Sequence, residues 1–312
     1  MKTVIVGGVA GGASAAARPR RQDEQAEIVM LERGPYISFA NCGLPYYIGG
    51  EITKRSALTL QTPESFRSRF NVDVRVNQEA VAVDTQAKTV TVRRVDTGEE
   101  YTESYDKLLL SPGAAPLVPP MEGADDPRVF TLRNIPDTVK IRDYVDEEFP
   151  ETAVVVGGGY IGVEMAENLK KAGLDVTIVE LADHVIAPLD GDMAAEVHRY
   201  LRDQGIHLLL GKAVQAIDGT GDKLNLRLSE GEVETDMVIL SVGVRPDTAL
   251  AKQAGLALNP KGAIIVNEHM ETSAPDVYAV GDAIEITDFV TGNKGYVPLA
   301  GPAHKQGRIA AD

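Results

Sequence analysis

The chain has 312 residues, of which 44% are hydrophobic and 25% charged, a composition typical of a globular protein long enough for two domains. Its formal net charge of −15 disfavours nucleic acid and anionic membrane surfaces as partners. No apolar stretch reaches spanning length, the N-terminus enters a strand pattern without a signal peptide, and the single cysteine excludes an internal disulfide. We therefore expect a cytoplasmic protein.

The N-terminal residues predict a dinucleotide-binding βαβ unit. Residues 3–6 (TVIV) are typical of a buried strand, a glycine-rich turn leads into a helix, and residues 27–31 predict a second strand that ends at Glu32. Gly7, Gly11 and Gly12 allow a sharp turn and a close approach to a pyrophosphate, and Glu32 suits a ribose hydroxyl pair. Val9 stands in the second glycine position of the G-x-G-x-x-G pattern. A glycine-rich turn without a ligand is the alternative interpretation.

The only cysteine, Cys42, lies in the run SFANCGLPYY at residues 38–47. Gly43 and Pro45 predict a turn into a short helix, whose first amides would stabilise a thiolate. A lone cysteine is otherwise a small buried hydrophobic residue. The polar surroundings favour a redox nucleophile, and any disulfide formed here must be with a second molecule.

A second, strict copy of the fingerprint follows at residues 152–180. Residues 152–156 (TAVVV) predict its first strand, Gly157, Gly159 and Gly162 its turn, and residues 174–179 its second strand, which ends at Glu180. Glu180 would repel a 2′-phosphate, and residues 181–184 contain no Lys or Arg to hold one. The sequence therefore predicts NADH as the preferred cofactor over NADPH.

A third element comes near the end of the chain, where residues 277–280 predict a short buried strand before Gly281 and Asp282. Asp282 could accept a hydrogen bond from a polyol hydroxyl, or it could be an ordinary helix N-cap. Its position indicates that the first domain resumes after an inserted second one.

Together these residues resemble the flavin-dependent pyridine nucleotide–disulfide oxidoreductases. The run around Cys42 is similar to the single-cysteine branch of coenzyme A disulfide reductases, NADH-dependent persulfide reductases, and NADH oxidases and peroxidases. The resemblance implies an α/β fold with two Rossmann-like dinucleotide-binding domains of the glutathione reductase type. Residues 1–115 and 246–312 would form the FAD-binding domain, and residues 116–245 the NADH-binding domain.

The resemblance also implies roles for individual residues. Cys42 would be catalytic, Tyr160 would cover the flavin where nicotinamide enters, and Glu164 would lie near the nicotinamide amide, although helix packing and a solvated face are the alternatives for the last two. Substrate contacts, including cations for the phosphates of coenzyme A, would come from Ser14, Arg18, Arg21, Ser38 and Asn41. A solvated helix face is the alternative interpretation for the two arginines. The cofactor-binding residues, for FAD or NADH, would be Gly7, Val9, Ala10, Gly11, Gly12, Glu32, Arg33, Asn41, Ser111, Pro112, Gly113, Gly157, Gly159, Tyr160, Ile161, Gly162, Glu164, Glu180, Gly243, Gly281, Asp282, Leu299 and Ala300.

Two features depart from the family pattern. Pro19 interrupts the first predicted helix, where proline removes a hydrogen bond and clashes with the preceding turn. The sequence therefore does not predict the local backbone geometry at Arg18 and Arg21. The sequence stops at Asp312 inside an apparent helix. Members of the family continue into a C-terminal dimerisation domain, which is absent here, so we expect a homodimer only for a full-length protein.

By this resemblance, NADH reduces the flavin, and the electron pair passes to sulfur at Cys42 to reduce coenzyme A disulfide, a polysulfide or a persulfide. The first alternative is an NADH oxidase or peroxidase with a cysteine sulfenic acid. The second is a flavin electron-transfer or redox-signalling protein, against which Cys42 argues. The five scattered histidines show no paired spacing, so we expect no metal site.

Overall fold

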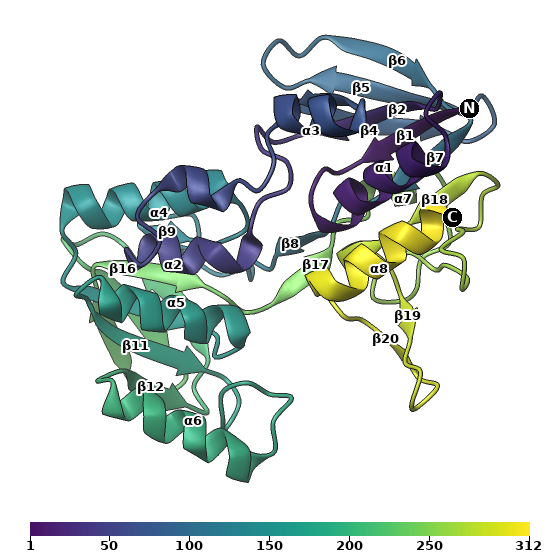
Figure 1. The fold of residues 1–312 in the computed structure, drawn as a ribbon. Helices are drawn as coiled ribbons and strands as arrows, with labels where there is room; N and C mark the ends of the chain where they lie inside the picture. The colour runs from purple at the N-terminus through teal and green to yellow at the C-terminus, as the bar shows by residue number, and fades with distance from the viewer. The chain divides into compact units, whose positions relative to one another are not determined.

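The computed structural model describes all 312 residues, and they divide into two compact units. Unit 1 comprises Met1–Phe39, Thr59–Ala115 and Arg245–Asp312, and unit 2 comprises Ala40–Leu58 and Pro116–Val244. Each unit is described by itself below, with labels as in Figure 1. None of the helices combines the length and apolar character that a membrane span needs.

Unit 1 is built on a parallel sheet in the order β18-β7-β1-β2-β3. Strands β1 and β2 are buried on both faces, which explains their nearly continuous runs of Val, Ile, Met and Leu. The remaining elements are the two-stranded ribbon β19-β20, a three-stranded antiparallel sheet and the helices. The bounds in unit 1 are β1 Lys2–Val6, α1 Ala10–Gln22, β2 Glu27–Glu32, α3 Pro63–Phe70, β3 Asp73–Val76, β4 Gln78–Asp84, β5 Thr89–Arg94, β6 Glu100–Ser104, β7 Lys107–Leu110, α7 Ala249–Gln253, β18 Val277–Ala279, η3 Gly281–Ala283, β19 Ile286–Thr287, β20 Lys294–Gly295 and α8 Ala300–Ala311.

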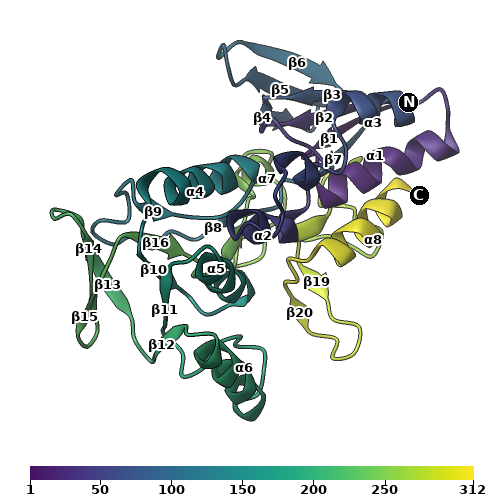
Figure 2. The same ribbon diagram turned by 60° about the vertical axis from the view of Figure 1, so that its left-hand side comes forward.

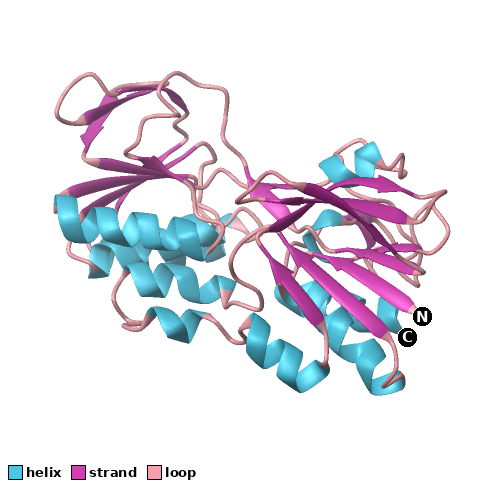
Figure 3. Cartoon of the chain, turned by 90° about the horizontal axis from the view of Figure 1, so that it is seen from above, coloured by secondary structure: helices cyan, strands magenta, loops and turns pink.

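The two faces of this sheet bury different partners. Ile5, Ile28 and Met30 pack with Ala15 and Ala16 of α1 on one face. On the other face, alternate residues of β1, β2 and β7 pack against the antiparallel sheet β4-β5-β6. The parallel sheet therefore lies between a helical layer and a second sheet, as the view from above shows (Figure 3).

Unit 2 repeats this architecture with the sheet order β12-β11-β10-β16-β9 and a three-stranded antiparallel sheet β13-β14-β15. Strands β8 and β17 pair where the chain passes between the units. The bounds are η1 Asn41–Gly43, α2 Leu44–Ile48, η2 Arg55–Leu58, β8 Ala114–Pro116, β9 Val129–Phe130, α4 Ile135–Glu148, β10 Thr152–Val156, α5 Tyr160–Lys171, β11 Asp175–Glu180, α6 Gly191–Asp203, β12 His207–Leu210, β13 Val214–Asp218, β14 Leu224–Leu228, β15 Glu232–Thr235, β16 Met237–Leu240 and β17 Val244–Pro246.

The core of unit 2 is also split between the faces of its sheet. Val155 and Ile178 pack with Met165 and Leu169 of α5 on the helical face. On the opposite face, Val154, Val156 and Leu240 pack with Ile217, Leu224 and Leu226 of the antiparallel sheet. Figures 1 and 2 show α5 lying along the sheet beside α2.

Residues 40–58 belong to unit 2, although the sequence groups them with the N-terminal domain. Ile48 of α2 is fully buried in the core formed by α4, α5 and their sheet. Its carbonyl accepts from Arg142 Nη1 at 2.8 Å, and Glu51 pairs with Lys171 at 3.1 Å. The buried side chain of Ile48 and the contacts made by Arg142 and Lys171 thus hold residues 40–58 against α4 and α5. This segment includes Cys42. Which nucleotide each unit binds stays a prediction.

Candidate dinucleotide sites and the Cys42 segment

The first glycine turn joins the end of β1 to the start of α1. Gly7 has φ +96°, and a Cβ there would lie 2.1 Å from the carbonyl oxygen of Ser111, while one at Gly12 would lie 1.8 Å from that of Gly7. At Gly11 it would meet Ser111 Oγ at 2.7 Å. Gly7 and Gly12 are therefore required by the fold, whereas a Cβ at Gly11 would have to displace the side chains of Ser111 and Val280. Val9 occupies the N-cap, with no capping side chain and no acidic residue in the first turn, so the helix itself supplies no side chain to its first amides.

Glu32 lies where β2 ends and braces this turn. Its carboxylate accepts hydrogen bonds from the backbone N–H of Gly8 and of Gly34, both at 2.8 Å. The neighbouring Arg33 forms an ion pair with Asp247 at 2.8 Å. Glu32 thus has the location predicted for a ribose acceptor, and its two hydrogen bonds order the loops on either side.

Ser111, Pro112 and Gly113 follow β7, next to β1 in the sheet. The N–H of Ser111 donates to Val6 at 2.8 Å, and Gly113 has φ +77°. From β1 the chain continues to β2 and β3 on one side of the sheet, whereas β7 and β18 lie on the other side of β1. The position between β1 and β7 is therefore the topological switch point. Open α/β sheets bind ligands there, outside the carboxyl ends of the strands. The Gly7 turn and Ser111 therefore lie together at the expected place.

Gly281 and Asp282 fall in the short 3₁₀ turn η3 rather than at the start of an α-helix. Gly281 has φ +78°, and its N–H donates to Oε1 of the buried Gln306 at 2.8 Å. Leu299 is the N-cap of α8 and Ala300 its first residue. A Cβ at Gly307 would lie 2.4 Å from the carbonyl oxygen of Gly11, so α8 lies against α1 in close backbone contact (Figures 1 and 2).

The second glycine turn has the same construction. Gly157 has φ +105°, and a Cβ there would lie 2.3 Å from the carbonyl oxygen of Ser241, the residue after the adjacent strand β16. A Cβ at Gly162 would lie 2.0 Å from the carbonyl oxygen of Gly157. Gly159 differs, because a Cβ there would meet nothing within 4 Å. It is the N-cap of α5, again with no capping side chain and no acid in the first turn. The space beside Gly159 is open, which leaves room for an anionic group at this helix start.

The exposed residues at this end of α5 are Tyr160 and Ile161, with 60% and 41% of their surface accessible. A large exposed tyrosine at a helix start is available to cover a planar ring. Gly243 lies beyond β16 with φ +111°, and its carbonyl accepts from the N–H of Leu117 at 2.9 Å. These positions are compatible with the nucleotide-binding roles predicted for them.

Two glutamates set the electrostatics of the second turn. Glu180 accepts from the N–H of Gly158 and, at 2.8 Å, from that of Ala182, repeating the arrangement at Glu32. Glu164 is half-buried one turn into α5. Burial, with a smaller contribution from the charge of Glu167, raises the pKa of Glu164 above its ordinary value. A partly desolvated carboxyl in this position can hold an amide by hydrogen bonds.

Cys42 lies on the surface of unit 2, in the 3₁₀ turn Asn41–Gly43 that runs directly into α2. Asn41 is also exposed, so both side chains are accessible to solvent. The predicted turn into a short helix is present, and the alternative of a buried structural thiol does not agree with this exposure. Just before it, in unit 1, Ser38 has φ +44°, with its N–H bonded to Gly8 and its carbonyl to Leu60.

The predicted substrate-binding residues of α1 have different surroundings. Ser14 Oγ lies 2.6 Å from His304 Nδ1, and Arg18 forms a two-pronged pair with Asp312 at 2.6 and 3.1 Å. Arg21 is exposed and has no ion pair. The helix continues through Pro19 to Gln22, so Arg18 and Arg21 remain on a regular helix one turn apart.

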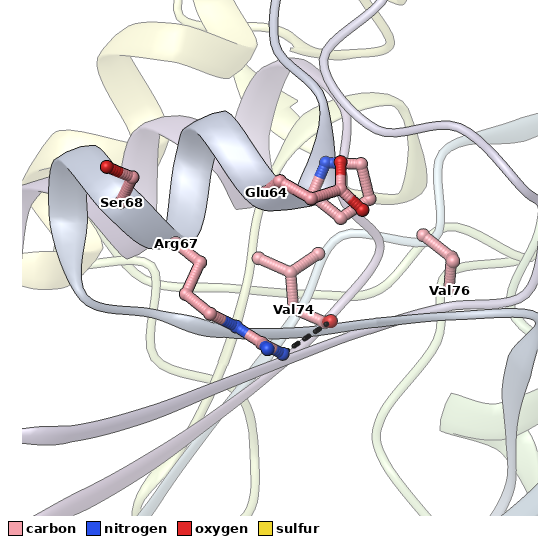
Figure 4. A pocket seen from close by; sticks show the side chains of 6 residues that line it. Glu64, Arg67, Ser68, Val74 and Val76 are labelled. Atoms are coloured by element: carbon pink, nitrogen blue, oxygen red, sulfur yellow. Dashed lines mark hydrogen bonds between the residues drawn. The ribbon is translucent and has the colours of Figure 1, made fainter.

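Several residues of these sites were not predicted. Gln306 and Gly307 hold α8 to Gly281 and α1, and Ser241 walls the second turn. A cavity of about 360 Å³ beside α3 and β3 contains none of the predicted site residues (Figure 4). In it, Arg67 Nη2 lies 3.5 Å from the carbonyl oxygen of Val74.

The fold and both turns define a protein with tandem dinucleotide-binding units. The chain belongs to the pyridine nucleotide-disulphide oxidoreductases, whose family model matches residues 1–307. Membership implies the use of FAD and NAD(H). The uncapped starts of α1 and α5, each with a carboxylate beside it at Glu32 or Glu180, fit these two cofactors. The sequence-based prediction of the family and of the α/β fold class is confirmed.

Individual relatives cover nearly the whole chain. An "NADH oxidase" of Methanocaldococcus jannaschii is 39% identical over 99% of this chain and 69% of its own length, and a "Coenzyme A disulfide reductase" of Staphylococcus haemolyticus is 36% identical over 100% and 69%. The solved Bacillus anthracis CoADR-RHD is 52% identical with a TM-score of 0.97, over 99% of this chain and 56% of that one. A NAD-dependent persulfide reductase from A. fulgidus is 38% identical with a TM-score of 0.96, over 100% and 58%.

The chain thus spans less than two thirds of both solved structures.

Proposed function

We propose that the full-length protein is a flavin-dependent NADH:disulfide oxidoreductase that reduces coenzyme A disulfide, a polysulfide or a persulfide through Cys42. The observation that carries the proposal is the exposure of the chain's one thiol, on a segment anchored to a dinucleotide-binding unit. Relatives named for coenzyme A disulfide and persulfide reduction support it.

The chemistry at sulfur needs only one protein thiol. The Cys42 thiolate attacks the outside disulfide, forming a mixed disulfide and releasing one thiolate product. Bound FAD would supply the electron pair, taken from NADH, that cleaves this mixed disulfide and restores the Cys42 thiolate with release of the second product. For a persulfide, the same attack gives a Cys42 persulfide or mixed disulfide that is reduced in turn.

We assign the adenosine end of NADH to unit 2, beside Glu180. The carboxylate would accept from the ribose hydroxyls and repel a 2′-phosphate, which supports NADH over NADPH. Comparing kcat/KM for the two cofactors tests this assignment, and a preference for NADPH would overturn it.

Coenzyme A brings several negative phosphate charges, so its site needs cations in this acidic chain. We propose Arg18 and Arg21 of α1 for this role, with Ser14, Ser38 and Asn41 as hydrogen-bonding groups. Arg21 is exposed without an ion pair, whereas Arg18 would exchange its contact with Asp312 for phosphate.

Replacing the thiol tests the proposal most directly. In the full-length protein, Cys42→Ser should keep its FAD and its reduction by NADH but lose at least a hundredfold in disulfide or persulfide reduction. Mass spectrometry of the native wild type should find a coenzyme A or persulfide adduct on Cys42. Undiminished disulfide reduction by Cys42→Ser would refute the scheme.

The second candidate function is an NADH oxidase or peroxidase, favoured by the 39% identical relative of that name. In it, Cys42 would cycle through a sulfenic acid in place of a mixed disulfide. A sulfenic acid trapped on the native protein, with NADH oxidation that depends on oxygen or peroxide and not on added disulfide, would favour this function.

We also propose that the full-length protein is a homodimer.

A further inference from the structure

The loop between β11 and α6, residues 181–190, follows directly after Glu180 and is here called the ribose loop. Its start is fixed by two bonds, from the N–H of Ala182 to Glu180 and from the N–H of Gly211 to the carbonyl of Ala182, both 2.8 Å. Its middle is fixed to the fingerprint, because the N–H of Ile186 donates to the carbonyl of Gly158 at 2.8 Å. The loop and the second glycine turn therefore form one structure.

Val185 is the centre of this loop. Its side chain is fully buried, and a Cβ at Gly158 would lie only 2.8 Å from its Cγ1. Its N–H donates to Nε2 of His198, near the middle of α6, at 3.1 Å. His184 Nδ1 lies 3.0 Å from the Val185 carbonyl. A buried N–H without an acceptor is costly, so the loop depends on the acceptor that His198 provides.

His198 is itself buried, with 9% of its surface accessible. Since Nε2 accepts from an amide, the ring carries its proton on Nδ1 and is neutral. The charged or titratable groups facing it are Arg202 on α6 and His184 and Asp183 on the loop. Burial, followed by Arg202 and His184, lowers the pKa of His198 against an opposing effect of Asp183, which keeps the acceptor available at neutral pH.

We propose that His198 is a positioning residue for the adenosine half of NADH, because it holds the ribose loop at Val185 and thereby fixes Glu180 beside the second glycine turn. This inference rests on the proposed use of NADH by unit 2. His198 does not touch the nucleotide. It acts by ordering the loop before binding, so that binding does not have to supply the ordering free energy.

The first test compares His198→Leu, which removes the acceptor, with His198→Gln, whose amide oxygen can replace it. His207→Leu, on the exposed edge strand of the same sheet, is the matched control. We expect the Kd for NADH, measured by anaerobic fluorescence titration, to rise about tenfold in His198→Leu. His198→Gln should stay within about threefold of the wild type. The control should not change.

Reduced nicotinamide mononucleotide separates positioning from a general defect, because it lacks the adenosine half. Its rate of flavin reduction should be equal in all four proteins. Hydrogen exchange without nucleotide should speed up at residues 181–190 in His198→Leu only. If His198→Leu binds NADH as the wild type does, or loses both nucleotides equally, the inference is wrong.

A pH series serves if His198→Leu does not fold. Protonated His198 cannot accept from Val185, so the wild-type Kd for NADH should rise as pH falls from 7 to 5, and more steeply than that of His198→Gln. Parallel profiles would overturn the inference while leaving the proposed function intact. A wild type that binds no NADH at any pH would instead overturn the proposed function.

Discussion

At the scale of single residues, the carboxyl of Glu164 makes the fold less stable at neutral pH. Its pKa is raised mainly by burial and then by Glu167, so the ionised form present at neutral pH is penalised in the folded state. The penalty is present above the folded pKa and disappears as pH falls toward the unfolded value, where both states hold the proton. The family resemblance assigns Glu164 to the nicotinamide amide, and a carboxyl held against this penalty is available for such a contact.

We therefore predict that Glu164→Gln raises the Tm at pH 7 by about 1–2 °C and weakens NADH binding. The gain in Tm should vanish at pH 4. Glu167→Gln is the comparison, and it should stabilise less, because it removes only the smaller contribution to the penalty on Glu164 and also breaks the ion pair with Lys171 at 3.0 Å. Differential scanning fluorimetry at both pH values measures the effect, and a lower Tm for Glu164→Gln at pH 7 would contradict it.

At the scale of elements, the second glycine turn contains glycines that the backbone packing requires and one, Gly159, that it does not require. Gly162 is buried against the carbonyl oxygen of Gly157, whereas the space beside Gly159 is open and its φ of −72° suits any residue. In the G-x-G-x-x-G pattern, close backbone packing thus explains the glycine at position 162, whereas the glycine at position 159 has a different cause, which we assign to the ligand.

Gly162→Ala should destabilise unit 2 by about 3 kcal/mol, because its Cβ would overlap backbone that cannot move away. Gly159→Ala should cost less than about 1 kcal/mol. It should nevertheless raise the Kd for NADH at least tenfold by filling the pyrophosphate space, about 1.4 kcal/mol of binding free energy. Urea denaturation and NADH titration of both variants measure the two effects. Equal stability losses would show that Gly159 is also structural.

Much of these elements could be predicted from the sequence. The buried strands at residues 3–6 and 152–156, the glycines after them and the acids Glu32 and Glu180 are linked over short separations, so local pattern was sufficient. Gln306 and Gly307 could not be found in this way. Their partners Gly281 and Gly11 are set by how distant segments pack, and neither residue type signals such a contact.

The packing of residues 40–58 was missed for a related reason. The segment is short and mostly polar, and its anchor is a single apolar side chain, Ile48, with bonds from Arg142 and Lys171 on distant helices. The resemblance to the family places residues 1–115 together in the FAD-binding domain, and this segment lies within that range. The exposure of Cys42, by contrast, agrees with the polar residues around it in the sequence.

At the scale of the whole molecule, the excess of 46 acidic over 31 basic residues makes acid the informative perturbation. Stability lost in acid comes from carboxylates whose pKa the fold lowers, because they must be protonated against their partners. Asp276 is such a group. It precedes β18 and joins it to two other segments, through Lys107 at its Oδ1 and Lys88 at its Oδ2, both 2.6 Å.

Lys107 and then Lys88 lower the pKa of Asp276 to about 2. A lowered carboxyl pKa stabilises the fold above the unfolded value of 3.8, and this contribution is lost as pH falls through about 2. We predict that Asp276→Asn unfolds at lower urea than the wild type at pH 7, by a margin that is still present at pH 4.5 and shrinks steadily below pH 4. Asn tolerates the φ of +63° at this position, so the margin reports charge and not backbone strain. Asp125→Asn, an exposed loop carboxylate without an ion pair, is the control and should follow the wild type at every pH. A margin for Asp276→Asn that does not change with pH would show that its two lysine contacts contribute packing alone.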